Sequence, residues 1–210
     1  MRGISSLAAI VLAVAPLAVA RAQTVGSGSE FEVAPYVGYM VFGNYLEGPL
    51  GTSLSSSTAP VYGAQLGMRL TPNIVLLGNV ASSSGDLKVG LPFIGGTSIG
   101  TNSLLMYDAD LQLDLPHAGD KDLSFSPFIQ AGIGQMRYDI QAISILQTQA
   151  TNTAYNVGAG ADIAVGKGFG VRLMAKDYIG KFNFQDATSF DIQGRTAHNF
   201  ALSAGLRIDF

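Results

Sequence analysis

The chain has 210 residues, a formal net charge of −3 at pH 7 and no cysteine; 48% of its residues are hydrophobic and only 13% are charged. Without cysteine it has no disulfide, no thiolate nucleophile and no cysteine-based metal site, which excludes the disulfide-stapled class of secreted proteins. The mildly acidic balance provides no basic patch, so nucleic acid is excluded as a partner.

The N-terminal segment has the features of a secretory signal peptide. Arg2 precedes an apolar run over residues 4–19, and Ala20-Arg21-Ala22 forms an Ala-x-Ala cleavage site. The alternative is an uncleaved transmembrane anchor, which would require about 20 apolar residues. We therefore predict a signal peptide over residues 1–22 and an exported domain over residues 23–210. Cleavage removes two arginines and leaves 10 basic against 15 acidic residues, a net charge of −5.

Beyond the signal peptide, the apolar residues are spread through segments that alternate between apolar and polar positions. A β-strand sends successive side chains to opposite faces, so such a segment has one apolar and one polar face. The alternation is clearest at the C-terminus, where every even position from Phe200 to Phe210 is apolar. Eight strands are predicted, over residues 31–42, 62–70, 74–83, 105–114, 125–138, 155–166, 170–184 and 197–210.

The connections between these strands alternate in length. Residues 71–73 and 167–169 are tight turns, and residues 116–122 form a medium turn. The longer connections are residues 43–61, 84–104, 139–153 and 185–196. Short turns on one side and long loops on the other are typical of outer-membrane barrels. The pattern predicts an all-β fold, an eight-stranded antiparallel up-and-down transmembrane β-barrel.

Aromatic residues concentrate near the predicted strand ends. Such residues form girdles at the two interfaces of a membrane barrel with water. We assign this role to Phe31, Tyr62, Phe125, Tyr138, Tyr155, Phe182, Phe200 and Phe210.

Charged residues of both signs fall on the predicted inward faces. The lumen of an eight-stranded barrel is only wide enough for its own side chains, so we expect a paired network of charges that plugs it. The residues of this network are Glu32, Arg69, Asp108, Asp110, Asp162, Arg172, Lys176 and Arg207. A gate or a narrow ion path is the alternative, and Asp108 with Asp110 would supply two ligands for a hard cation. Because no third or fourth ligand is visible, we predict neither a metal site nor a cofactor.

Catalytic candidates are few. The chain has only two histidines, whereas a barrel hydrolase requires His, Ser or Asp side chains within hydrogen-bond reach of one another. His117 falls in a predicted turn. His198 has lipid-facing parity in the last strand and Ser203 has the opposite parity, so the two do not pair. We therefore predict no catalytic residues and a protein that is not an enzyme, with a lipid-modifying barrel enzyme as the least favoured alternative.

The last strand also matches the assembly signal of bacterial outer-membrane barrels. The signal combines a polar residue, a glycine, an apolar residue and a terminal aromatic, here Ser203, Gly205, Ile208 and Phe210. With the segments Ser126–Gly134, Ala154–Asp162, Val171–Leu173 and His198–Phe210, the chain resembles the small outer-membrane β-barrel family of Gram-negative bacteria. This is the porin-like group related to the OmpA transmembrane domain, OmpX and OmpW.

The resemblance implies location in the cell outer membrane, contact with its lipid and insertion by the outer-membrane assembly machinery. It implies no shared catalytic site. The function predicted is a structural or surface-interaction role for a non-enzymatic barrel with a mostly plugged polar lumen; whether it has an extracellular ligand is left open. The alternative is a narrow channel or a conduit for small molecules, including hydrophobic ones, as the likeness to OmpW would suggest. An exported soluble barrel or sandwich is the alternative outside the membrane.

Overall fold

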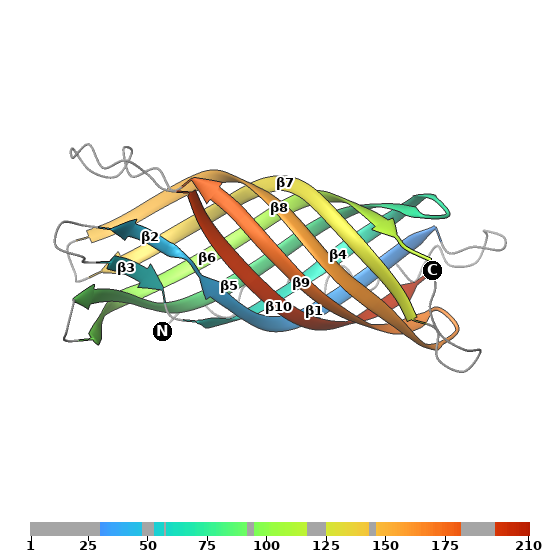
Figure 1. Ribbon diagram of the computed structural model, residues 1–210, viewed down its shortest axis with the longest axis horizontal. Helices are drawn as coiled ribbons and strands as arrows, with labels where there is room; N and C mark the ends of the chain where they lie inside the picture. The colour runs from blue at the N-terminus through green and yellow to red at the C-terminus, as the bar shows by residue number, and fades with distance from the viewer. Residues whose placement is uncertain are drawn as a thin grey trace.

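A computed structural model of the chain describes residues 30–47, 53–56, 58–91, 95–116, 125–142, 146–181 and 196–210. The wall strands within these ranges are β1 (Phe31–Phe42), β4 (Ala59–Thr71), β5 (Ile74–Leu91), β6 (Gly95–Asp114), β7 (Phe125–Ala142), β8 (Leu146–Gly166), β9 (Phe169–Lys181) and β10 (Thr196–Asp209). They pair in the order β5–β4–β1–β10–β9–β8–β7–β6, and β5 also pairs with β6. The sheet therefore closes into a barrel (Figure 1), and the predicted eight-stranded antiparallel architecture is confirmed.

The two ends of the barrel differ in the segments that connect the strands. The turns between β4 and β5 and between β8 and β9 lie at the same end as the C-terminus (Figure 1). We call this end the turn side and the opposite end the loop side. In the β8–β9 turn Gly168 has φ 69°, a left-handed conformation that glycine adopts without steric cost.

On the loop side, strand structure extends into segments for which the sequence predicts long loops. The strands β2 (Asn44–Glu47) and β3 (Ser53–Ser56) pair with each other, and β3 pairs with β5. In addition, β5 and β6 remain paired as far as Leu91 and Gly95, and β7 and β8 as far as Ala142 and Leu146. The prediction was wrong there because it relied on apolar alternation, whereas strand pairing needs only backbone hydrogen bonds.

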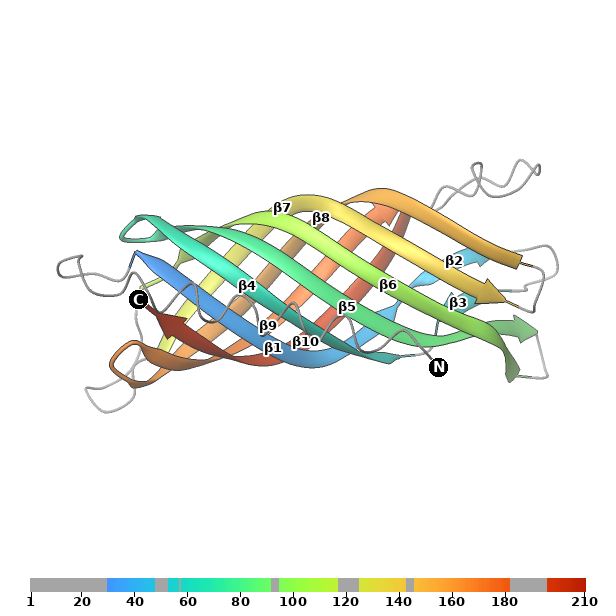
Figure 2. The ribbon, with the colours of Figure 1, turned by 180° about the vertical axis from the view of Figure 1, so that it is seen from behind.

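The two faces of the wall have opposite character. In β1, even-numbered residues such as Ala34 and Met40 are buried inside the barrel, and odd-numbered residues such as Val37 and Tyr39 are 57% and 66% exposed outside. In β5, where the sequence does not separate the faces, Leu77 points inward and Val80 outward. Figure 2 shows the wall from behind, where β5, β6 and β7 run side by side. So large an exposed apolar surface is unfavourable in water and requires lipid around it.

We call the exposed apolar residues of the outer face, such as Val37, Val80, Ile133 and Leu202, the apolar belt. Aromatic residues mark both of its edges. Phe31, Phe125 and Phe169 are exposed at the turn-side ends of their strands, and Tyr62 and Tyr155 lie toward the loop side. Tyr138 was assigned to a girdle in error: its position in β7 has inward parity, and it is only 4% exposed. Phe182 lies outside the described residues. No helix in the described ranges has the length and apolarity to cross a membrane.

Candidate functional site

The buried charges on the turn side of the lumen are centred on Arg172. Its guanidinium donates from Nε and Nη2 to both carboxylate oxygens of Asp162 at 2.8 Å, and Nη2 lies 2.9 Å from Oε1 of Glu32. Arg207 donates to Asp162 and to Asp209, each at 2.7 Å. We call these five residues the Arg172 cluster. Three acids against two arginines give it a formal charge of −1, and the Arg172 side chain is 3% exposed.

A second cluster lies closer to the middle of the barrel, around Lys176. Its ammonium group is 2.5 Å from Oδ1 of Asp108 and 2.6 Å from Oδ2 of Asp110, and the side chain is fully buried. Asn156 donates to both acids, and Asn79 donates to Asp108 at 2.8 Å. We call these five residues the Lys176 cluster. Two acids against one lysine give a formal charge of −1.

The two clusters follow each other along the barrel because Arg172 and Lys176 are four residues apart on the inward face of β9. At about 3.3 Å per residue, their Cα atoms are separated by about 13 Å along the strand. Arg69, the remaining residue of the predicted network, belongs to neither cluster. It pairs with Asp114 at 2.9 Å at the turn-side edge, and its side chain is 28% exposed.

Several partners of the network residues are not among the eight residues predicted for it. Asp209 has an inward position in the predicted last strand but was not assigned to the network, and Asp114, the partner of Arg69, also has inward parity. The amides of Asn79 and Asn156 bond to the buried acids, and Gln65 accepts from Arg172 at 3.0 Å. Amide side chains at inward positions were the available signal, because buried charges need additional hydrogen bonds to be stable.

Inward-facing glycines make room for these large side chains. The Asp110 side chain lies against Gly132 on the neighbouring strand β7, where a Cβ atom would overlap Asp110 and the backbone oxygen of Ala109. In the same way the ring of Tyr36 lies over Gly63. Tyr36 in turn donates to Asn79 at 2.9 Å, so the glycines are part of how the polar network is positioned.

Toward the loop side the lumen is filled by apolar side chains together with the buried polar residues Ser83, Asn102 and Asn199. On β6, Met106 lies one inward position closer to the loop side than Asp108 and is fully buried. We call the following group, whose members are at most 7% exposed, the apolar plug: Met40, Phe42, Val61, Leu104, Met106, Met136 and Tyr138. Among the described residues, the buried charged side chains of the lumen thus lie in the half nearer the turn side.

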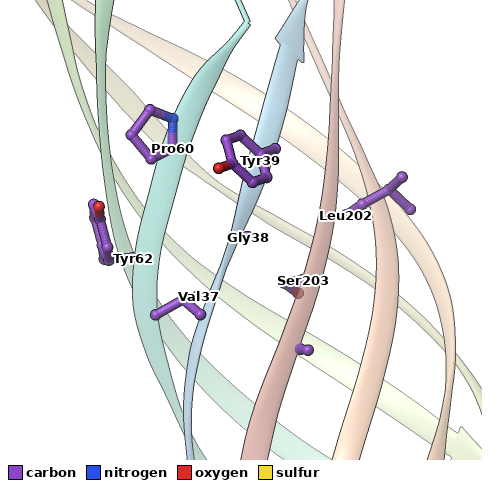
Figure 3. A pocket seen from close by; sticks show the side chains of 8 residues that line it. Val37, Gly38, Tyr39, Pro60, Tyr62, Leu202 and Ser203 are labelled. Carbon is purple, nitrogen blue, oxygen red and sulfur yellow. The ribbon is translucent and has the colours of Figure 1, made fainter.

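An apolar groove with a volume of 470 Å³ lies on the outside of the barrel, across β4, β1 and β10 (Figure 3). Val37, Tyr39, Pro60, Tyr62 and Leu202 line it. These residues belong to the apolar belt, so the groove faces lipid and does not open into the lumen.

Within the described part of the chain, His198 does not form a catalytic constellation with Ser203. His198 is exposed on the outer face of β10, where its Nδ1 lies 2.8 Å from Oδ2 of Asp177. Ser203 has the parity of the buried Ala201 and lies on the opposite face. His117 lies outside the described residues.

The described residues contain no group of three His, Cys, Asp or Glu side chains that could hold a metal ion. Asp108 and Asp110, the pair considered for a hard cation, bind Lys176 instead. The ammonium group therefore occupies the position between the two carboxylates.

The four residues of the predicted assembly signal lie on β10 and at its end. Ile208 is 40% exposed on the outer face, and Gly205 is on the inner face, packed against the backbone of Pro35 and the side chain of Tyr36. The ring of Phe210 stacks on Phe31 with centroids 6.4 Å apart, and their backbones exchange two hydrogen bonds. The C-terminal residue thus helps to close the β1–β10 seam.

The model of the outer membrane protein beta-barrel domain family matches residues 5–207. Among solved structures, Neisserial surface protein A is 13% identical with a TM-score of 0.63, covering 88% of this chain and 99% of that one. OprG from Pseudomonas aeruginosa is 9% identical with a TM-score of 0.62, covering 89% and 99%. AlkL in lipid bilayers is 12% identical with a TM-score of 0.51, covering 90% and 94%. A comparison with curated protein sequences found no match.

Proposed function

Because this chain belongs to the outer membrane protein beta-barrel domain family and is located in the outer membrane, we propose that it is a non-enzymatic protein with a structural or surface-interaction role and a closed lumen. The observation that carries the proposal is that side chains fill the lumen at successive heights along the barrel axis. Lys176 nearer the turn side and Met106 nearer the loop side are both fully buried. Eight strands leave an interior that side chains can fill, so such packing blocks a water-filled pore.

Conductance in planar bilayers tests this proposal directly. The same preparation is first run boiled and unboiled on a detergent gel, because a closed barrel shifts its mobility only after heating. We expect a heat-dependent shift and no unitary current steps above the protein-free baseline. Reproducible steps from the heat-shifting protein would contradict the closed lumen and favour a narrow channel.

A conduit for small hydrophobic molecules is the second candidate, and the apolar plug favours it. Met40, Met106 and Met136 are unbranched and repack more easily than other apolar side chains. The entry of N-phenylnaphthylamine through the outer membrane of intact cells separates the two candidates. Equal rates with and without the protein are expected for a closed barrel, whereas faster entry in expressing cells would favour the conduit.

The proposal includes export by the signal peptide over residues 1–22 and insertion by the outer-membrane assembly machinery. Ser203, Gly205, Ile208 and Phe210 are the residues we assign to the assembly signal. Deleting Phe210 removes its stacking on Phe31, and we expect the amount of protein in the outer-membrane fraction to fall. Normal levels of a heat-shifting truncated protein would contradict the assembly role.

A further inference from the structure

Three of the six methionines of the chain belong to the apolar plug. Met40, Met106 and Met136 are each at most 1% exposed. Met106 lies directly opposite Met136 in the β6–β7 register, and both have inward parity. Met40 lies on β1, which is on the other side of the eight-stranded ring from β6 and β7. Thioether side chains therefore enter the lumen from opposite walls.

The contacts of Asn199 show that these side chains converge. Its Nδ2 lies 4.0 Å from the sulfur of Met136, so Met136 reaches across the lumen to β10. On the neighbouring strand, Met40 pairs with Ala201, two residues from Asn199, and thus lies diagonally opposite Asn199 on the inward face. Long side chains in this diagonal relation are within reach of each other. The sulfur of Met136 and the side chain of Met40 therefore both lie beside Asn199.

Two features of the surroundings favour a positive charge at this place. Oδ1 of Asn199 is buried and has no hydrogen-bond partner among the described residues. The Lys176 cluster begins at the next inward position of β6, where Asp108 follows Met106 at about 7 Å along the strand. Because that cluster has two acids against one lysine, its formal charge of −1 is buried without a counter-charge. A cation in the plug would offset it.

The ligand atoms determine which cation fits. Thioether sulfur is a soft ligand that selects Cu(I), whereas Mg²⁺, Ca²⁺ and Mn²⁺ prefer carboxylate, carbonyl and water oxygens. We propose that the sulfurs of Met40, Met106 and Met136, together with Oδ1 of Asn199, bind one soft monovalent cation of the Cu(I) class inside the lumen. The inference goes beyond the structural or surface role and does not depend on it.

The site is enclosed, and this determines how it is loaded. The buried polar residues Ser83, Asn102 and Asn199 lie on the loop-side part of the lumen, so a hydrated ion that enters from that side finds oxygen ligands first. Because the ligands are each at most 1% exposed, the cation is supplied while the barrel refolds.

The test uses the chain without residues 1–22, refolded in detergent micelles in chloride-free buffer with Ag(I) as the probe. Ag(I) has the ligand preference of Cu(I) and is not oxidised in air. Native mass spectrometry then counts the cations retained by heat-shifting protein after free metal is removed. We expect one Ag(I) per chain and no Mg²⁺. Because the cation binds only the folded barrel, the temperature of the heat-dependent gel shift should also rise.

Leucine substitutions test the thioethers, because leucine has nearly the volume of methionine and no sulfur. We expect Met106→Leu to weaken Ag(I) binding at least about tenfold, and the triple variant Met40→Leu, Met106→Leu, Met136→Leu to retain none. Met68→Leu is the matched control. It removes a thioether from the lipid-facing side, where Met68 is 40% exposed, and should leave Ag(I) retention unchanged.

The exposed imidazole of His198 is the competing ligand for a soft cation. Ag(I) that is retained by the triple leucine variant and lost in His198→Ala would place the cation on the outer face and overturn the proposal. Absence of Ag(I) from heat-shifting parent protein, or equal retention by the Met106→Leu and Met68→Leu variants, would also overturn it.

Discussion

The turn-side and loop-side halves of the lumen are filled by different physical means. The turn side contains the Arg172 and Lys176 clusters, in which buried charges are held by ion pairs and amide hydrogen bonds. The loop side contains the apolar plug, in which packing is accompanied by contacts such as the hydrogen bond from Asn199 to the hydroxyl of Tyr138 at 3.4 Å. Breaking a buried ion pair costs about 3–5 kcal/mol because a charge is left without its partner, and truncating a buried apolar side chain costs about 2–5 kcal/mol because a cavity is left. Substitutions at the two ends of the barrel should therefore destabilise it for different reasons.

The largest effect is expected from Arg172→Met. The change leaves Glu32 and Asp162 buried without their principal cation, and the free energy of unfolding should fall by about 3–5 kcal/mol. Urea unfolding in lipid vesicles, followed by the loss of the heat-dependent gel shift, measures it. Arg69→Met is the control, because the Arg69–Asp114 pair is partly exposed and should contribute less than about 1 kcal/mol. Similar losses of unfolding free energy in both variants would show that the buried Arg172 cluster contributes no more to stability than the partly exposed Arg69–Asp114 pair.

Met106→Ala tests the apolar half. Truncating this fully buried side chain should cost about 2–5 kcal/mol through lost contacts and a cavity, whereas Met106→Leu should cost less than about 1.5 kcal/mol. The same unfolding assay applies. Met68→Ala is the matched control on the lipid-facing side, where Met68 is 40% exposed, and its effect should stay within about 0.5 kcal/mol. If Met68→Ala were as damaging as Met106→Ala, the plug would not be a packed core.

Gly132→Ala tests whether the Lys176 cluster needs the space that a glycine leaves beside Asp110. The added Cβ would overlap Asp110 and the backbone of Ala109, so we expect a loss of about 1–3 kcal/mol. Gly78→Ala is the control, because a Cβ at Gly78 has no neighbouring atom within 4 Å. If Gly132→Ala left the free energy of unfolding unchanged, the side chains of the Lys176 cluster would have room to shift.

The smallest effect is expected from His198→Ala. The His198–Asp177 pair lies outside the lumen with the histidine side chain 60% exposed, and such pairs contribute less than about 1 kcal/mol. Unfolding free energy and gel shift should be close to those of the parent chain. A loss comparable to that of Arg172→Met would mean that the outer face also carries an essential polar contact.

The strand faces in β1, β4 and β6 could be predicted because lipid imposes a strict apolar parity on the outward positions. The same reasoning failed on the loop side of the apolar belt, where it predicts loops. There β5 to β8 continue as strands with polar residues on the outward face, so apolar and polar positions no longer alternate. Tyr138 illustrates the limit for a single residue. Its aromatic ring suits a membrane interface, but its parity places it inside the plug.

The sequence could predict that charges line the inner faces, but it could not predict how they pair. Arg172 and Asp162 are neighbours because Asp162 lies opposite Arg172 in the β8–β9 register. Lys176, in contrast, reaches Asp108 and Asp110 across the lumen from a strand that does not pair with β6. Contacts across the lumen depend on the curvature and stagger of the closed barrel, which no local pattern specifies. The apolar plug was not predicted as a group. Met40 and Met106 have inward parity in predicted strands, but Val61 and Leu104 fall in the predicted loops over residues 43–61 and 84–104.

The proposed closure of the lumen is tested by the accessibility of a single thiol placed between the two halves. Ala201 is 5% exposed and lies opposite Lys176 on one side and Met40 on the other, and the chain has no native cysteine. A charged sulfonate thiol reagent is applied to vesicles containing the Ala201→Cys variant or, as the exposed control, the Ser103→Cys variant. We expect rapid modification at position 103 and none at position 201 until the barrel is denatured. Modification of both positions at similar rates in heat-shifting protein would contradict it.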